Sequence, residues 1–175
     1  GDAGRTREAL ELGERVLADR ERLLGADHPD TLSARNNLAV SYGDAGRTRE
    51  ALELGERVLA DRERLLGADH PDTLNARHNL AVSYSASGRT REALELRERV
   101  LADHERLLGA DHPDTLSARN NLAVSYSASG RTREALELGE RVLADRERLL
   151  GPDHPDTLNA RNNLANPRAI AADIQ

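Results

Sequence analysis

Residues 1–42 read GDAGRTREALELGERVLADRERLLGADHPDTLSARNNLAVSY, and nearly the same text returns three times along the chain. The second copy begins at Gly43, the third at Ser85 and the fourth at Ser127. Because a fixed period of this length indicates an array of stacked units, the repeat decides the fold before any single motif does. One such unit is too small to bury its own apolar face, so its stability must come from interfaces with its neighbours.

The composition limits both the core and the partners. Hydrophobic residues make up 38% of the chain, with no Phe, Trp or Met, so the core must consist of Leu, Val and Ala. All 25 basic residues are Arg, and the net charge of −6 argues against a general phosphate-binding surface. The absence of Cys excludes disulfides and thiolate metal sites.

The sequence gives little information on location. No apolar run is long enough to span a membrane and no signal peptide is visible, so a cytoplasmic location is the default expectation.

Each repeat is expected to form two helices. The first, helix A, is predicted from Pro29 to Ala45, because Pro loses no hydrogen bond at a first helical position and Gly46 can end the helix. The second, helix B, is predicted from Arg49 to Leu66, with Thr48 as a plausible N-cap. No segment alternates with the period of a strand, so no sheet is expected.

The order of small and aromatic positions resembles the tetratricopeptide repeat, and most closely its kinesin-light-chain-like subfamily. The segments that carry this resemblance are Asp27–Asp30, Asn36–Ala39, Tyr42, Gly46 and Glu50–Ala51. The resemblance implies an all-α fold, a right-handed superhelical solenoid of antiparallel helix pairs, over residues 1–165. The family usually has an aromatic residue in helix B where this chain has Gly13, Gly55, Arg97 and Gly139. A glycine there would let adjacent helices approach closely.

The two ends of the array lack partners in the sequence. The chain begins inside the pattern and without Met, so we expect it to be a segment of a longer array. A first helix B is expected over Thr6–Leu24, and a last helix A from Pro155 to about Asn166. Residues 166–175 are expected to form either a short capping helix starting at Pro167 or a disordered tail. The apolar residues expected to be partly exposed on the first helix are Leu10, Leu12, Val16 and Leu17. On the last helix A, Leu158 and Leu164 are expected to lack their usual cover.

Two classes of chemical site find little support in the sequence. His28 and its equivalents His70, His112 and His154 each lie in an Asp-His-Pro-Asp turn. A metal site would need ligands from several repeats, but neighbouring helices are about 8–10 Å apart. The alternative is a turn that starts helix A.

The sequence contains no catalytic motif. It also lacks the unique, asymmetric group of residues that an active site requires. We therefore expect neither enzymatic activity nor a cofactor.

A column of Asn residues is the strongest candidate for binding. In the family that the sequence resembles, helix A lines the concave surface, and the Asn matching Asn36 contacts the backbone of bound peptides. Through Ala165 the copies differ at only eight of 42 columns, and four of these fall on one stripe of helix A, where Val40 also lies. The expected peptide-binding residues are Ser33, Asn36, Val40, Asn75, His78, Val82, Ser117, Asn120, Val124, Asn159 and Asn162.

Other interpretations of the same residues stay open. The Asn column could instead form hydrogen bonds between adjacent repeats, and solvent-facing columns could simply vary more freely. The adjacent Asn37, Asn79, Asn121 and Asn163 are expected to face neighbouring helices. The leading hypothesis is a scaffold for a protein or peptide partner. A second is self-assembly, because near-identical units can stack head to tail. A third, RNA binding, is disfavoured by the acidic balance and the scarcity of aromatic residues.

Overall fold

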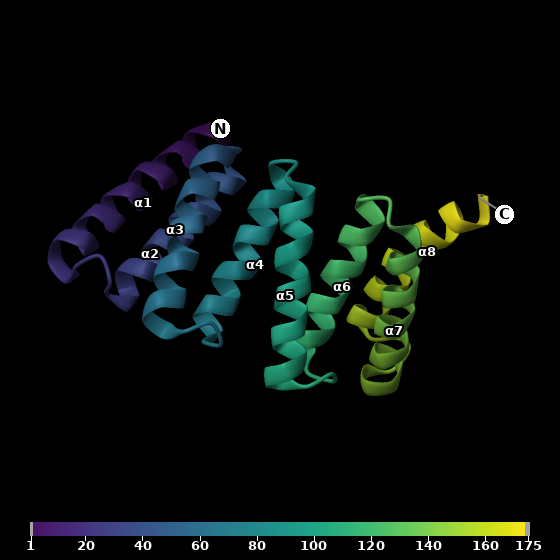
Figure 1. The fold of residues 1–175 in the computed structure, drawn as a ribbon. Coiled ribbons are helices and arrows are strands. Elements are labelled where there is room, and N and C mark those ends of the chain that lie inside the picture. The colour runs from purple at the N-terminus through teal and green to yellow at the C-terminus, as the bar shows by residue number, and fades with distance from the viewer. Residues whose placement is uncertain (1, 174–175) are drawn as a thin grey trace. The chain divides into compact units, whose positions relative to one another are not determined.

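The computed structural model describes the backbone of residues 2–173, which forms eight α-helices and no strand (Figure 1). The odd-numbered helices are the B helices of the repeats and the even-numbered ones are the A helices, as the sequence predicts. Their bounds are α1 Asp2–Leu24, α2 Pro29–Asp44, α3 Thr48–Leu66, α4 Pro71–Ala86, α5 Thr90–Leu108, α6 Pro113–Ala128, α7 Thr132–Leu150 and α8 Pro155–Asp173. Within the described residues, no helix has the length and apolar character needed to cross a bilayer.

Histidine side chains begin the A helices. Nδ1 of His28 accepts a hydrogen bond from the backbone N–H of Asp30 at 3.1 Å, with Pro29 in the first turn. The same bond recurs at His70, His112 and His154. The imidazole therefore satisfies one of the N–H groups that have no partner inside the helix. This confirms the expectation of a turn that starts helix A.

The proposed N-cap of helix B was wrong. Thr48 is the first helical residue of α3, and Arg47 occupies the cap position without a side-chain cap bond. The hydroxyl of Thr48 donates instead to the carbonyl of Gly46 at 3.4 Å. That hydroxyl belongs to a residue already inside the helix, so it cannot play the role that an N-cap oxygen plays.

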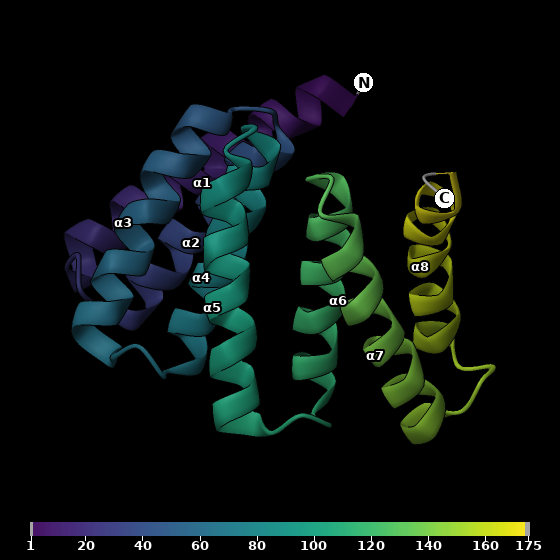
Figure 2. The same ribbon diagram turned by 45° about the vertical axis from the view of Figure 1, so that its right-hand side comes forward.

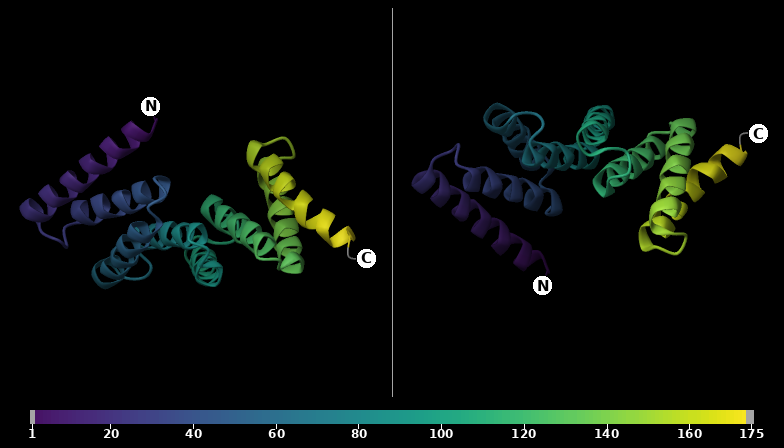
Figure 3. Two further views of the ribbon diagram at one scale, coloured as in Figure 1. Left: turned by 90° about the horizontal axis from the view of Figure 1, so that it is seen from above. Right: turned by 90° about the horizontal axis from the view of Figure 1, so that it is seen from below.

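The chain divides into two compact units, Gly1–Leu96 and Arg97–Gln175. In the first unit, α2 contacts α1, α3 and α4, and the antiparallel course of α1 and α2 is visible from above and below (Figure 3). In the second unit, which Figure 2 shows with α6, α7 and α8 labelled, α7 contacts both α6 and α8, and α6 also contacts α8. In the first unit, α2 thus packs between α1 and α3 and also touches the next A helix, α4.

Glycine in helix B allows close helix packing, as the sequence predicts. A Cβ atom at Gly55 would lie 3.2 Å from Cδ1 of Leu80, and one at Gly139 would lie 2.8 Å from Cδ1 of Leu164. Both leucines are buried in the core. In the third repeat Arg97 replaces the glycine, and its guanidinium donates a hydrogen bond to Ser125 Oγ.

A buried arginine joins α2, and another joins α6, to the B helices on either side. Arg35 of α2 donates to Glu21 of α1 at 2.8 Å and to Asp61 of α3 at 2.7 Å, with 3% of its side chain exposed. Arg119 of α6 repeats the arrangement with a carboxylate from α5 and one from α7. These ion pairs hold three successive helices together, and the sequence analysis did not single them out.

The ends agree only in part with expectation. Leu12, Val16 and Leu158 are exposed and Leu17 is half-buried, as predicted. Leu10 and Leu164 are buried, and the prediction for them was wrong. Helix α1 already contacts α2, which gives Leu10 an inner face on which to pack. Leu164 lies over Gly139, so it needs no following helix for its cover.

The last helix is longer than the sequence suggested. Helix α8 runs through Pro167 to Asp173, so no new helix begins at Pro167. Helix α2 ends where Gly46 adopts a positive φ of 72°. Ala172 occupies the equivalent position of the last repeat, and without a glycine the left-handed turn is disfavoured. The backbone therefore continues as a helix and does not fold back over the last repeat. The first helix likewise starts at Asp2, earlier than the expected Thr6.

Candidate functional site

Helix A carries its buried and accessible residues on different faces. In α2 the buried face comprises Thr31, Leu32, Ala34, Arg35, Leu38 and Ala39. Ser33, Asn36 and Val40 lie between these positions, at the spacing of one helical stripe. Val40 is exposed, and Ser33 and Asn36 are half-buried. We call this line, with its equivalents in the other repeats, the helix-A stripe.

The other repeats present the same stripe. In the first unit, Asn75, His78 and Val82 occupy α4, which contacts α2 directly. In the second unit, α6 and α8 also touch each other. All members of the predicted binding set are exposed or half-buried, and those of the second unit are Ser117, Asn120, Val124, Asn159 and Asn162. The structure thus places neighbouring predicted residues together within each unit.

Asn side chains link adjacent A helices across the stripe. Nδ2 of Asn79 donates to Oδ1 of Asn36 at 3.3 Å, and Asn163 donates to Asn120 in the same way at 3.2 Å. The expectation that these Asn residues face a neighbouring helix is therefore confirmed for Asn79 and Asn163. It was wrong for Asn37, which is exposed because no A helix precedes α2 in the described residues. The Asn column of the stripe also bonds between repeats, as the alternative interpretation held. Because their amide oxygens accept these bonds, Asn36 and Asn120 each keep an NH₂ group with two donors.

The histidines and carboxylates do not assemble a metal site. Among the described residues, no group of three His, Asp or Glu side chains is placed to hold a metal ion. The turn histidines have a structural use, because Nδ1 of His28 and its equivalents caps the following helix.

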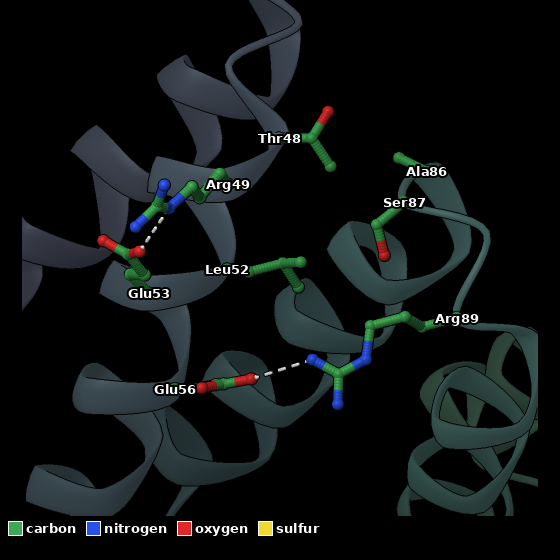
Figure 4. A pocket seen from close by; sticks show the side chains of 8 residues that line it. All are labelled: Thr48, Arg49, Leu52, Glu53, Glu56, Ala86, Ser87 and Arg89. Atoms are coloured by element: carbon green, nitrogen blue, oxygen red, sulfur yellow. Dashed lines mark hydrogen bonds and ion pairs between the residues drawn. The ribbon is translucent and has the colours of Figure 1, made fainter.

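One cleft of about 560 Å³ lies on the B-helix side of the first unit, between α3 and the end of α4 (Figure 4). Its charged groups are already paired. Arg49 donates to Glu53 at 2.8 Å, and Arg89 donates to Glu56 at 3.3 Å. Leu52 contributes an apolar side chain to the lining. Most of these residue types recur in every copy, which indicates a feature of the repeat and not a unique reactive centre.

A tyrosine beside this cleft has a perturbed pKa. The hydroxyl of Tyr84 donates to Glu56 at 2.8 Å, and the guanidinium carbon of Arg89 lies 4.4 Å from the ring centroid. Burial, with the hydrogen bond to Glu56 as a further cause, raises the pKa of Tyr84 to about 12. Tyr126 and Glu98 repeat the arrangement, and the pKa of Tyr126 is likewise about 12. These tyrosines stay neutral and act as structural donors.

The sequence profile of the family described as Tetratricopeptide repeat matches residues 1–30, 31–72, 73–114 and 115–156. None of the curated proteins matches the sequence. These matched segments include every residue of the stripe up to Val124, but not Asn159 or Asn162.

Solved structures provide a second comparison. One match is a crystal structure of nearly identical TPR-like repeats from a protein described as a kinesin light chain of Podosopora anserina. Its sequence is 35% identical to this chain and its TM-score is 0.84. The match covers 98% of this chain and 90% of that chain. A variant of it is 36% identical with a TM-score of 0.88, over 97% of this chain and 80% of that chain. BtubC (BKLC) from P. vanneervenii is 26% identical with a TM-score of 0.83, over 97% of this chain and 68% of that chain.

Proposed function

The chain belongs to the tetratricopeptide repeat family and is kinesin-light-chain-like, and from this premise we propose that it is a non-enzymatic scaffold that binds an extended peptide along the helix-A stripe. The observation that supports this proposal most is the state of the stripe amides. Asn36 and Asn120 are held by a bond to their oxygen, which leaves their NH₂ groups as oriented donors. Backbone carbonyls of a peptide are the matching acceptors.

The spacing of the helices suits an extended ligand. Adjacent packed helices lie about 8–10 Å apart, and an extended chain rises about 3.3 Å per residue. In the second unit, where α6 contacts α8, Asn120 and Asn162 would therefore meet peptide carbonyls roughly three residues apart. The residues between these contacts could rest on Val124, which is exposed on α6. The ligand class is thus an extended segment with small apolar side chains, bound mainly through its backbone.

A panning experiment with a phage-displayed library of random linear peptides tests the proposal. A selected peptide would be synthesised, and its affinity measured by calorimetry for the 175-residue chain and its variants. Asn162→Ala is the cleanest substitution, because the Asn162 side chain is exposed and no hydrogen bond between repeats is lost. We expect affinity to fall about three- to tenfold, as for the loss of one hydrogen bond of about 0.5–1.5 kcal/mol. Val124→Asp, in the same unit, should weaken binding further by adding a charge.

Asn37→Ala is the matched control. Asn37 is also an exposed Asn on an A helix, but it lies one residue away from the stripe, so this variant should bind like the parent chain. All three variants should unfold at nearly the same urea concentration. Peptide affinities of Asn162→Ala and Val124→Asp that equal those of Asn37→Ala and the parent chain would rule the stripe out as the binding surface.

A further inference from the structure

The buried arginine column is incomplete at one end of the chain. Arg35 and Arg119 each bind two carboxylates, one from the preceding B helix and one from the following B helix. Arg161 of α8 occupies the same place in the last repeat. It binds Glu147 of α7 at 2.8 Å, but 46% of its side chain is exposed, and no second carboxylate partner is found among the side chains that the structure describes. Its guanidinium can still donate to another acid.

A carboxylate equivalent to the missing second partner of Arg161 lies at the other end of the chain, on α1. Arg35 and Asp61 are 26 residues apart, as are Arg119 and Asp145. In a continued array, the residue 26 places after Arg161 would correspond to Asp19 of α1. Asp19 is 67% exposed, and its one ion pair within the described part of the chain is with Arg22 of its own helix, at 3.2 Å.

A second ion pair is divided between the ends in the same way. Arg64 of α3 reaches Asp27, in the turn before α2, at 2.8 Å, across 37 residues. The equivalents at the two ends are Asp153, in the turn before α8, and Arg22 of α1. Arg22 is 68% exposed, and the side chain of Asp153 is also exposed.

Apolar residues that are buried between inner repeats are exposed at the two ends of the chain. Leu158 of α8 is 42% exposed, whereas its inner equivalent Leu32 is 1% exposed. Val16 of α1 is 38% exposed, whereas Val58 is buried completely. The outward faces of α8 and α1 are therefore two halves of the interface that the chain already uses between α2 and α3. At the positions that would meet, the two faces carry opposite charges: Arg161 would meet Asp19, and Asp153 would meet Arg22.

We propose that a second copy of this chain docks head to tail, with α8 of one copy on α1 of the next, and that Arg161 of the first donates to Asp19 of the second. Asp153 and Arg22 would form the second pair of the same junction. The contact joins two different faces, so it can repeat from copy to copy and does not close into a symmetric dimer. The continuous helix α8 leaves Leu158 and Arg161 uncovered, so both residues are available for the contact.

A charge-exchange experiment tests this junction on the 175-residue chain. Sedimentation equilibrium over a wide concentration range should show that the parent chain self-associates. Asp19→Arg alone would place two arginines together at each junction, and Arg161→Asp alone would place two aspartates together. Because like charges facing each other in an interface are strongly unfavourable, each variant should associate at least about tenfold more weakly. Both altered positions are exposed, and circular dichroism melts should confirm that each variant folds.

An equimolar mixture of the two variants provides the decisive result. Every junction in the mixture can then join an arginine to an aspartate, so association should return to the level of the parent chain. The chain that carries both substitutions should also self-associate. A parent chain that stays monomeric throughout would overturn the proposal. Association of the single variants that equals that of the parent, or a mixture that stays monomeric, would do so as well.

Discussion

Nη1 of Arg119 lies 2.8 Å from Oδ2 of Asp145, and this contact joins α6 to α7 through a guanidinium that is only 2% exposed. The other amino group of Arg119 binds Glu105 of α5 at 2.7 Å. A buried charge is costly unless it is paired. The two carboxylates therefore fix how the three helices pack, because any other arrangement would leave the guanidinium without a partner.

Replacing this arginine should strongly destabilise the array. Arg119→Met removes the buried charge and leaves Glu105 and Asp145 facing each other, with an expected loss of about 3 kcal/mol in the free energy of unfolding. Arg161→Met is the matched control, because Arg161 is 46% exposed and should lose less than about 1 kcal/mol. Urea unfolding at low protein concentration measures both. Equal losses would show that burial of the ion pairs contributes little.

The sequence predicted most of the fold because the period and the helix ends are local signals. Pro29 and Gly46 mark the limits of helix A to within one residue, and the close packing at Gly55 was inferred from a missing side chain. The role of Arg35 could not be inferred in this way. Its burial arises only when Glu21 and Asp61, from two different B helices, come together around it.

The candidate site was predictable as a stripe, but its hydrogen bonds were not. The helical period places Ser33, Asn36 and Val40 on one line. Which atoms of Asn36 remain available depends on Asn79 in the next repeat, a contact that no local pattern specifies. Peptide binding by this stripe stays a proposal.

Two glycines on adjacent helices should respond differently to alanine. Gly43→Ala adds a methyl group whose nearest neighbour, Cβ of Ala51, lies 4.0 Å away. It should stabilise the chain by about 0.5–1 kcal/mol, because alanine is the better helix former. Gly55→Ala has the same gain, but its methyl group lies 3.2 Å from buried Leu80, and overpacking costs about 1–3 kcal/mol. Thermal unfolding should therefore rank Gly43→Ala above Gly55→Ala, and the reverse order would contradict close packing at Gly55.

The histidine caps should contribute measurable stability. His70→Ala removes the acceptor for the N–H of Asp72, which lies 3.1 Å from Nδ1. Loss of a side-chain N-cap costs about 1 kcal/mol, so the midpoint of urea unfolding should fall. His70→Asn keeps a side-chain acceptor near the same place and should recover most of the loss. If His70→Asn were as unstable as His70→Ala, the imidazole would be acting through packing and not as a cap.

The tyrosine–glutamate pairs should make stability depend on pH in the alkaline range. The pKa of Tyr84 is about 12 in the folded chain, against an ordinary value of 10.0. The folded state therefore holds this proton more tightly than the unfolded state. Its contribution to stability is fully present below pH 10 and is lost as the pH rises towards about 12. Tyr126 should add a second contribution over the same range.

Ultraviolet absorbance of the tyrosinate measures this shift directly. In the variant that keeps Tyr84 as its only tyrosine, made with Tyr42→Phe and Tyr126→Phe, the ionisation midpoint should lie near pH 12. Adding Glu56→Gln removes the charge that accepts the bond from the Tyr84 hydroxyl. The midpoint should then move down but stay above 10.0, because burial is the largest cause of the raised pKa. A midpoint at the ordinary value in the folded chain would show that the hydroxyl of Tyr84 is neither buried nor bonded to Glu56.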